Sequence, residues 1–461
     1  MNKFYITTAI DYTNDVIHLG HAYQKVLADV LARYRRLIGD KTFFLTGTDE
    51  HGSKSEQAAK EKGQTPKEFV DEISKKDQEQ QDALNISYDR FIRTTDVDHK
   101  ELVKEFWLKV KKNGDIYKGK YTGLYCVGCE AYKTESEIVD GKCTLHPTKE
   151  LQKVTEENYF FRWSKYTDFL KEHIEKHPEF IQPKERKNEM LSFLKQGIQD
   201  ITVSRQKDKV SWGIPVPDDP TQVIYVWFDA LINYISGAPD FWPADVHILG
   251  KDNARWHVLL WPAMLKSAGY ELPKIVYVHS FFSIDGQKIS KSLGNVIRPT
   301  DFVKNYTVDG ARYYLIKHGP LVEDVDIRLE HVKEVYNADL ANNLGNLVAR
   351  VARLAETSGL AFPSLKRRRL LRLKELEELR FSEALAFIWD KITSANKFID
   401  ENKPWEQKGE ALKKTLAHLI AEIREIGTLL QPFLPETAEK IEKQFEGSKI
   451  KTGKPLFPRL R

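Results

Sequence analysis

Two short segments combine basic and small residues in an order that suits the binding of a polyphosphate. The segment at 18–21 reads His-Leu-Gly-His, between a predicted strand and a predicted helix. The start of a helix offers unpaired N–H groups and positive charge, so phosphates bind there. His18 and His21 could donate hydrogen bonds to phosphate oxygens, and Gly20 would let a ribose or an adenine lie against the backbone. The segment at 288–292, Lys-Ile-Ser-Lys-Ser, follows an Asp-Gly turn and supplies two cations on one loop.

Three cysteines and one histidine form another group, with the spacing of metal ligands. Cys126 and Cys129 make a C-x2-C pair, and Cys143 and His146 follow as a second pair. Three thiolates and one imidazole close a tetrahedral Zn²⁺ site and leave no position for water, which predicts a structural ion. Because the fourth donor is a histidine, an iron–sulfur cluster is the weaker hypothesis. The alternative is that the cysteines are small buried side chains and that His146 lies on the surface.

The composition excludes several classes of protein. Of 461 residues 41% are hydrophobic, and 71 basic against 67 acidic residues leave a net charge of +4, so the chain is not intrinsically disordered. A nucleic acid would have to bind at local basic patches, because no large uniform positive charge exists. The sequence has no apolar stretch long enough to span a membrane and no signal-peptide core before the first predicted strand. We therefore expect a cytoplasmic protein without membrane contact.

The apolar pattern predicts a parallel α/β sheet that must position the two basic segments. Strand, helix and strand patterns follow one another at 4–8, 22–38 and 42–46, which is typical of a βαβ arrangement. From about residue 335 apolar residues recur every three or four positions, which indicates an all-helical region. Further strands, expected in the same sheet, lie at 223–228, 247–249 and 275–279, and further helices begin at Pro66 and cover 99–112 and 256–267.

Together and in this order, the two basic segments resemble the HIGH and KMSKS signatures of class I aminoacyl-tRNA synthetases. The changes of Ile to Leu in the first and of Met to Ile in the second keep the apolar character. Over nearly its whole length the chain resembles the methionyl-tRNA synthetase family. The segments that carry this resemblance are YITTAIDY at 5–12, GTDEHG at 47–52, VWFDAL at 226–231, GKD at 250–252 and WPAML at 261–265.

The resemblance implies a Rossmann-like catalytic domain that is split by a zinc-bearing connective insertion and followed by an all-α anticodon-binding helix bundle. We predict the two catalytic halves at 1–114 and 223–280, with the insertion and its zinc knuckle at 115–222. A region with the KMSKS loop and contacts to the tRNA stem follows at 281–335, and the helical domain covers 336–461. Because the chain ends soon after that domain, we expect a monomer.

For the nucleotide, the resemblance implies an ATP site in which phosphate contacts carry the catalysis. His18, His21, Lys288 and Lys291 would stabilise the phosphates during the reaction, and Mg²⁺ would accompany the ATP. No enzyme nucleophile is needed, because the carboxylate of the amino acid is already ionised. The full set of expected ATP-binding residues is His18, Gly20, His21, Gly250, Asp252, Lys288, Ser290 and Lys291.

For the amino acid, the resemblance implies L-methionine. Asp49 matches the family position that binds the ammonium group, and Tyr12 and His279 could place donors near the weakly accepting sulfur. Leu231 departs from the proline of many relatives. Taken singly, Trp227 and Ile10 could be ordinary core residues. The expected methionine-binding set is Ile10, Tyr12, Asp49, Trp227, Ala230, Leu231, Tyr234 and His279.

For the nucleic acid, the resemblance implies tRNA(Met), both initiator and elongator. Asn346 and Arg350 are four residues apart and therefore share one helix face. They match the family's anticodon-contacting pair, and Trp405 matches an aromatic that stacks on the anticodon loop. Unpaired RNA bases do stack on aromatic side chains and bond to Asn and Arg. Without the resemblance, these residues would be read as a solvated helix face.

Three alternatives stay open at the level of sequence. The first is another class I synthetase, for cysteine or an aliphatic amino acid, although about 110 residues of insertion are too few for a large editing domain. The second is a catalytically inactive tRNA-binding relative, against which the complete histidine and lysine sets argue. The third is a small-molecule nucleotidyltransferase of the same superfamily, which would not explain the helical region.

Overall fold

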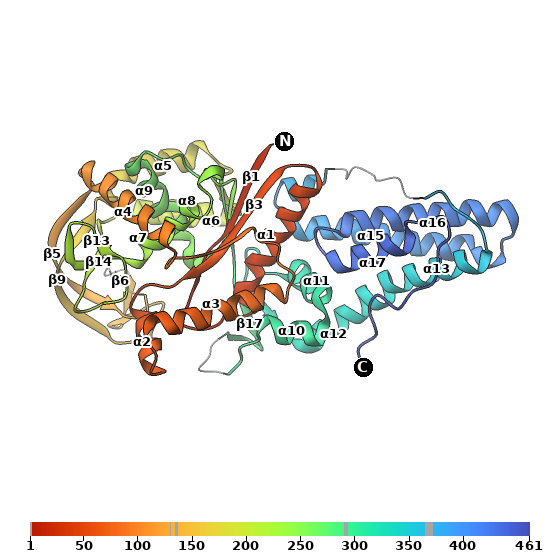
Figure 1. Ribbon diagram of the computed structural model, residues 1–461, viewed down its shortest axis with the longest axis horizontal. Helices are drawn as coiled ribbons and strands as arrows, with labels where there is room; N and C mark the ends of the chain where they lie inside the picture. Colours follow the sequence, from red (N-terminus) through yellow and green to blue (C-terminus); the bar gives the residue numbers. More distant parts are fainter. Residues whose placement is uncertain (1, 130, 134–136, 290–293, 365–371) are drawn as a thin grey trace.

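The computed structural model describes residues 2–129, 131–133, 137–289, 294–364 and 372–461. The molecule is elongated, with a parallel sheet near its middle, a long curved β-ribbon at one end and a group of helices at the other (Figure 1). The expected α/β fold with a helical C-terminal region is confirmed. Within the described residues, no helix has the length and apolar character that crossing a membrane requires.

A seven-stranded parallel sheet forms the centre of the molecule. Its order is β10-β16-β15-β1-β3-β2, with β4 also paired to β3. The first strand of the chain lies inside the sheet, because Ile6 pairs with Phe44 on one side and with Val246 on the other. The strand order therefore reverses beside β1, and ligands of such sheets bind in the crevice at the carboxyl ends of the strands at this point. The strands are β1 (Lys3–Thr8), β2 (Asp11–Tyr12), β3 (Lys41–Asp49), β4 (Arg90–Arg93), β10 (Ile181–Gln182), β15 (Val246–Gly250) and β16 (Ile275–His279).

Helix α1 (Leu19–Leu37) follows β1 and packs on the sheet. Its predicted apolar positions are buried, and the chain leaves it through Gly39 at φ +97°, a conformation that favours glycine. Helix α3 (Pro66–Asp82) begins at the expected cap, where Thr65 and Glu68 bond to each other's backbone N–H. The remaining helices around the sheet are α2 (Ser53–Glu61), α4 (Val97–Lys112), α5 (Thr167–Lys176), α6 (Lys184–Lys195), α7 (Val226–Leu231), α8 (Asn233–Ser236) and α9 (Trp261–Ala268).

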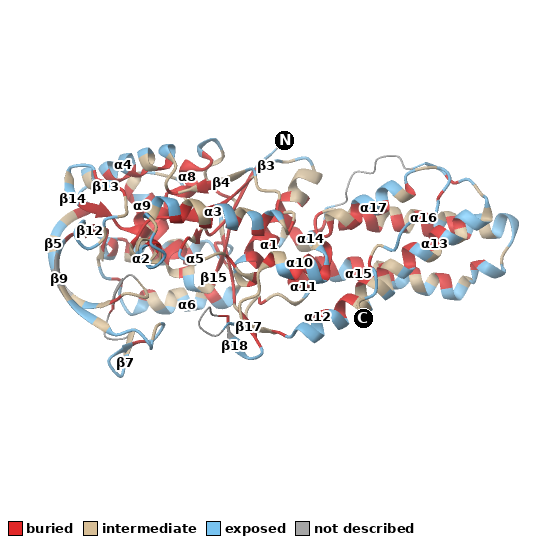
Figure 2. Cartoon of the chain, turned by 60° about the horizontal axis from the view of Figure 1, so that its bottom comes forward, coloured by how far each residue is buried: buried red, intermediate tan, exposed pale blue. Residues whose placement is uncertain are grey.

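The β-ribbon consists of β5 (Ile116–Cys126) and β9 (Leu151–Phe161), which pair along their whole length. The described side chains of its outer part are exposed at Lys120, Leu124, Gln152 and Lys153 and half-buried at Tyr125, Leu151 and Val154, so little apolar surface is buried there (Figure 2). Short strands extend it or cap its far end, namely β6 (Ala131–Lys133), β7 (Ile138–Val139), β8 (Lys142–Cys143) and β11 (Ile201–Thr202).

One predicted strand is wrong. The run at 223–228 does not join the central sheet, because β14 (Asp219–Ile224) belongs to a separate antiparallel sheet with β12 (Ser204–Gln206) and β13 (Pro215–Val216). Helix α7 then begins at Val226. A continuous apolar run is compatible with a buried strand and with a buried helix, so periodicity alone cannot separate the two. The sheet gains β10 from the insertion instead, through the pair Ile181 and Val276.

After β19 (Val325–Ile327) the described residues of the C-terminal region form helices joined by loops, and residues 446–461 form neither helix nor strand. Its helices turn their apolar faces inward and their charged faces to solvent (Figure 2). Arg312, which precedes β19 in the chain, is fully buried between α1 and the helical region, and it bonds to Asp29 of α1 at 2.7 Å and to the carbonyl of Phe433 at 2.8 Å. Helices α10 (Pro299–Tyr306) and α11 (Val308–His318) precede β19. The helices that follow it are α12 (Leu329–Val335), a π-helix (Tyr336–Gly345), α13 (Asn346–Ser358), α14 (Lys374–Glu377), α15 (Phe381–Asn402), α16 (Gly409–Leu430) and α17 (Pro435–Phe445).

Candidate active site

The start of α1 carries the two predicted histidines in a reciprocal cap. The Nδ1 atom of His18 accepts the backbone N–H of Gly20 at 3.0 Å, and the Nδ1 atom of His21 accepts the N–H of His18 at 3.3 Å. The two ring centroids are 4.1 Å apart. Because both Nδ1 atoms accept, each neutral ring carries its proton on Nε2. The helix start therefore presents two imidazole N–H donors.

The surroundings of both imidazoles lower their pKa values and so favour the neutral rings. Burial, followed by the neighbouring His21 and Arg298, lowers the pKa of His18 to about 2. Desolvation by the protein atoms around it, followed by Lys25 and Arg298, lowers the pKa of His21 to about 4, although its side chain reaches the surface. The glycine between them is required by space, since a Cβ on Gly20 would lie 2.8 Å from Cε1 of His18. This pair can thus act as hydrogen-bond donors to an anion without losing or gaining protons.

Further predicted residues lie at the carboxyl ends of neighbouring strands. Asp49 ends β3, Gly250 ends β15 and His279 ends β16. A Cβ on Gly250 would lie 2.9 Å from a carboxylate oxygen of Asp252 and 3.6 Å from Cε1 of His279. The parallel sheet thus brings the ends of these segments, which are far apart in sequence, to one edge beside α1.

His279 faces α1. Its Nδ1 atom lies 2.7 Å from the carbonyl oxygen of Ser280, and the ring meets the edge of Tyr23 with centroids 5.0 Å apart. Burial lowers its pKa to about 4. These contacts put His279 next to the nucleotide segment, and its expected role near a methionine sulfur stays a prediction.

A wall of aromatic and apolar side chains follows α7 and α8. Trp227 meets the edge of Tyr12 with ring centroids 6.3 Å apart, and Tyr12 is the register partner of Asp49. Ala230, Leu231 and Tyr234 are buried behind Trp227, and Ile10 packs against the same core. The structure therefore brings seven of the eight residues expected to bind methionine to the ends of β1 and β3 and to the α7–α8 segment.

Two residues of this wall were missed by the sequence analysis. Trp256 stacks on Trp227 with centroids 4.7 Å apart. The Nε2 atom of His257 lies 2.6 Å from the hydroxyl of Tyr234, and its Nδ1 atom lies 2.9 Å from the carbonyl oxygen of Asn253. Nδ1 therefore carries the proton, and the Tyr234 hydroxyl donates to Nε2. The available signal was a histidine inside the apolar run Trp256–Leu260, which forms a π-helical turn.

A buried carboxylate fixes the α7 wall relative to the end of β3. Asp229 lies 2.7 Å from Nδ1 of His51 and 2.7 Å from Nε2 of His99. His51 follows Asp49 by two residues, whereas Asp229 lies between Trp227 and Ala230. This triad joins the two sides of the expected amino-acid pocket. Both carboxylate oxygens of Asp229 have a histidine partner, so the buried carboxylate needs no solvent.

The second basic segment follows a tight hairpin. Strand β17 (Phe282–Ile284) turns through Asp285 and Gly286, both at positive φ, into β18 (Gln287–Lys288). Asp326 accepts the N–H of Gly286 at 2.7 Å and the hydroxyl of Ser283 at 2.8 Å, which holds the turn. The side chain of Lys288, together with Ser290 and Lys291, lies outside the described residues.

The ribbon carries a cluster of four possible metal ligands. Ligand atoms of Cys126, Cys129, Cys143 and His146 all lie within 4.8 Å of one another. The Nδ1 atom of His146 is 3.1 Å from Sγ of Cys129, which in turn is 3.5 Å from Sγ of Cys143. Four donors at these separations suit a tetrahedral ion with metal–sulfur distances of about 2.3 Å. This cluster can hold a metal ion.

The helical region brings the three expected anticodon residues to one area. Arg350 lies over the ring of Trp405 with Cζ 6.0 Å from the centroid, and it pairs with Asp400 at 2.8 Å. Trp405 is 54% exposed, which is unusual for a tryptophan and leaves a ring face open to stacking. Asn346, one turn before Arg350, lines an open cavity of about 390 Å³ with Phe457.

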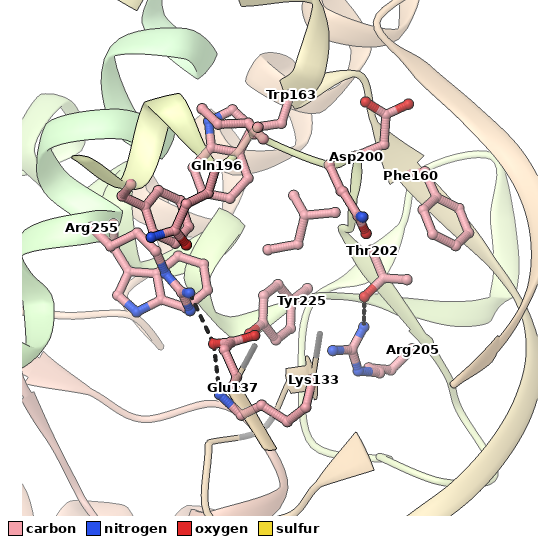
Figure 3. Close-up of a pocket in the computed structure, with 16 residues that line it drawn as sticks. Lys133, Glu137, Phe160, Trp163, Gln196, Asp200, Thr202, Arg205, Tyr225 and Arg255 are labelled. Atoms are coloured by element: carbon pink, nitrogen blue, oxygen red, sulfur yellow. Dashed lines mark hydrogen bonds and ion pairs between the residues drawn. The ribbon is translucent and has the colours of Figure 1, made fainter. Parts of the chain in front are cut away.

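A second cavity, of about 210 Å³, lies between residues of the expected insertion, from Lys133 to Arg205, and the residues Tyr225, Arg255 and Trp256 (Figure 3). Trp256 contributes to its wall, so a single side chain separates this cavity from Trp227. Glu137 accepts from Lys133 and from Arg255, each at 3.1 Å, as the dashed lines in Figure 3 indicate. The charged groups on this side of the cavity are therefore paired with one another.

Comparison with known proteins places these features in a family. The model of the family "tRNA synthetases class I (M)" matches residues 4–152 and 134–352. The methionine–tRNA ligases of Caldanaerobacter subterraneus subsp. tengcongensis and Clostridium acetobutylicum are each 43% identical over 99% of this chain, and it covers 79% and 78% of their lengths. A Mycobacterium tuberculosis methionyl-tRNA synthetase in complex with methionyl-adenylate superposes with a TM-score of 0.92 at 37% identity, over 100% of both chains. The chain belongs to the methionyl-tRNA synthetase family of class I tRNA synthetases.

Proposed function

We propose that this protein is a methionine–tRNA ligase, which activates methionine with ATP and transfers it to the 3′ end of tRNA(Met). The observation that carries the proposal is the pair of neutral imidazole donors at the start of α1, beside the carboxyl ends of β1, β15 and β16. That crevice is where an α/β sheet of this order binds nucleotides. The aromatic wall of α7 and α8 closes the same crevice from the side of β3.

In the first step the methionine carboxylate attacks the α-phosphorus of ATP and pyrophosphate leaves. The chain supplies position and charge stabilisation, because the attacking group is already ionised. The Nε2–H groups of His18 and His21 donate to phosphate oxygens whose charge grows in the transition state. Lys288 and Lys291 neutralise the β- and γ-phosphates, and Ser290, Gly250 and Asp252 complete the ATP site. The ATP site would also take Mg²⁺, which would neutralise part of the phosphate charge.

The amino-acid pocket selects methionine by shape and by one carboxylate. Asp49 pairs with the ammonium group, and Trp227, Ala230 and Leu231 enclose the unbranched side chain. Tyr234 is fixed by His257, so its hydroxyl keeps one orientation. A soft apolar slot of this kind suits a thioether, which makes favourable contacts with aromatic rings. Ile10, Tyr12 and His279 complete the expected set.

In the second step the methionyl group moves from the adenylate to the terminal ribose of tRNA. We propose that Asn346, Arg350 and Trp405 bind the anticodon, which initiator and elongator tRNA(Met) share. The exposed ring of Trp405 and the guanidinium above it support stacking of an unpaired base. The family's division into catalytic halves, insertion, KMSKS region and helical domain, with the bounds expected above, belongs to this proposal.

We further propose that the ribbon cluster holds one structural Zn²⁺. The donor set of three thiolates and one imidazole fits this ion, and a Cβ on Gly128 would lie 2.5 Å from Cγ of His146, so the C-x2-C turn is shaped around the imidazole. A bound zinc would order a ribbon tip that lacks a core. All four donors are used, so the ion takes no part in the chemistry.

The first test is ATP–pyrophosphate exchange with each amino acid supplied separately and without tRNA. We expect exchange with methionine alone. Exchange with a different amino acid would contradict the pocket assignment, and a chain that exchanges with none would contradict activation itself.

The tRNA assignment has its own test. Trp405→Ala should lower kcat/KM for charging of tRNA(Met) by roughly 10- to 100-fold, the range for one lost base stack, with exchange unchanged. Phe387→Ala is a matched control, since Phe387 is also an exposed aromatic of the helical region at 42%. Equal losses in the two variants, or a loss of exchange in Trp405→Ala, would refute an anticodon role.

A further inference from the structure

One arginine connects the chain that follows the second basic segment to the chain that precedes the first. The Nη1 atom of Arg298 donates to the carbonyl oxygen of Val16 and, at 3.0 Å, to that of Ile17. Its Nη2 atom pairs with Asp15 at 3.1 Å. We name this arrangement the inter-motif clamp, and it ends one residue before His18.

The backbone around the clamp is held from other sides as well. Asp15 accepts the N–H of Val16 at 2.8 Å, and Asp77 of α3 accepts the N–H of Ile17 at 2.8 Å. Next to Arg298, the carbonyl of Ile297 accepts the N–H of Leu19 at 3.1 Å. The backbone N–H groups of this loop thus donate to two carboxylates and one carbonyl. Arg298 donates to two backbone carbonyl oxygens of the same loop.

We infer that Arg298 is a positioning residue for the phosphate step, because it fixes the backbone from which His18 caps α1 and from which the two Nε2–H donors are aimed. The inference rests on the proposed function. The cap needs His18 in an extended conformation, at φ −121° and ψ 179°. A rotation of the preceding peptide would move the ring of His18 and, through the reciprocal bond, the ring of His21.

The chemistry of the guanidinium suits this role better than that of an ammonium. A planar fork holds three acceptors at fixed angles, whereas a lysine is a point charge with no preferred plane. The Arg298 cation also contributes, after burial and a nearer neighbour, to the lowered pKa of both imidazoles. It therefore helps to keep His18 and His21 neutral while it orients them.

The clamp can be altered without burying an unpaired charge. The side chains of Arg298 and Asp15 are 23% and 27% exposed, so water can reach the charge that a substitution leaves without its partner. A change at Arg298 should therefore appear in the kinetics and leave the fold intact.

The test compares Arg298→Ala, Arg298→Lys and Asp15→Asn in ATP–pyrophosphate exchange with methionine. We expect kcat to fall on the order of 10- to 100-fold in Arg298→Ala, the scale for small misplacements of catalytic groups, with a smaller fall in the other two. The KM for methionine should stay within about twofold, because the clamp is not part of the amino-acid wall. Arg33→Lys is the matched control for Arg298→Lys. Arg33 lies farther along α1, its side chain is 22% exposed, and it bonds to Asp29 and to the carbonyl of Asn85.

A double-mutant cycle separates positioning from general damage. If Arg298 acts through the imidazoles, Arg298→Ala should cost much less in a His21→Asn background than in the wild type. Equal losses in both backgrounds, a wild-type kcat in Arg298→Ala, or the same loss in Arg33→Lys would overturn the inference while the proposed function stands. A wild-type chain without exchange would instead overturn the proposed function, and the inference with it.

Discussion

The edge of the parallel sheet and the tip of the β-ribbon both gather residues from short motifs, but they do so by different physical means. At the sheet edge, the strand ends and α1 are embedded in large hydrophobic clusters, and backbone caps fix the histidines. At the ribbon tip, Cys126 is buried, but the other described side chains in the outer part of its strand are exposed or half-buried. Position comes from packing in the first region and, we propose, from a metal ion in the second.

This difference predicts how each region should respond to the substitution of one side chain. A buried site on a sheet keeps its geometry when one functional side chain is changed, because the surrounding core carries the fold. A metal-organised tip loses its geometry when one ligand is changed, because the ion supplies its folding free energy. The comparison predicts large kinetic and small structural effects at the sheet edge, and the reverse at the tip.

The largest effect is expected at His21. His21→Asn keeps an acceptor near the position of Nδ1 but lacks a donor that reaches as far as Nε2, so kcat for exchange should fall on the order of 10²- to 10³-fold. His21→Gln places an amide N–H nearer the Nε2 position and should recover part of that loss. Thermal unfolding of both variants should resemble the wild type. Equal activity in the two variants would mean that the cap, and not the donor, is what matters.

The next effect is expected at the ribbon. Cys143→Ser removes one of four donors and should weaken zinc binding by more than about 100-fold, beyond the range for outer-shell partners. Amide hydrogen exchange should rise at the ends of β5 and β9 that face the cluster, while β1 and β15 keep their protection. A single cooperative loss of protection across the whole chain would contradict the separation of the two regions.

The contrast also explains what the sequence could and could not predict. The strands at 247–249 and 275–279 and the body of α1 were predictable, because their apolar periods act locally, whereas α1 begins at Leu19 and not at 22, so Gly20 and His21 lie in its first turn. The secondary structure of the run at 223–228 was not predictable, because it depends on the surfaces against which the run is buried. His257 and Arg298 were missed for a related reason, since each acts on residues more than twenty positions away in the chain. The four ribbon ligands were predictable because the chemistry of the ion restricts their types and spacing.

A smaller effect is expected from the glycine inside the C-x2-C turn. A Cβ on Gly128 would approach the ring of His146 closely, so Gly128→Ala should displace one ligand and weaken zinc binding by about tenfold. Gly119→Ala, in the same strand as Cys126, is the control, because its Cβ would meet Tyr117 at an ordinary 3.4 Å. Competition with a chelator measures both. Equal affinities would show that the turn adapts and that the metal does not depend on the approach of the imidazole.

The smallest effect concerns pH, and it tests the sheet edge alone. Lowered to about 2 and about 4, the pKa values of His18 and His21 lie below the value of about 6.5 in an unfolded chain. The unfolded state therefore binds more protons between about pH 6.5 and pH 4, so folding stability falls as the pH is lowered through this window. The folded enzyme keeps both imidazoles neutral over most of it. We expect the pH profile of kcat for exchange to have no break near pH 6.5 in the wild type. A break that is present in the wild type and absent in His21→Asn is the result to look for. Such a break would mean that His21 works as a cation, and the neutral-donor geometry at the start of α1 would have to be abandoned.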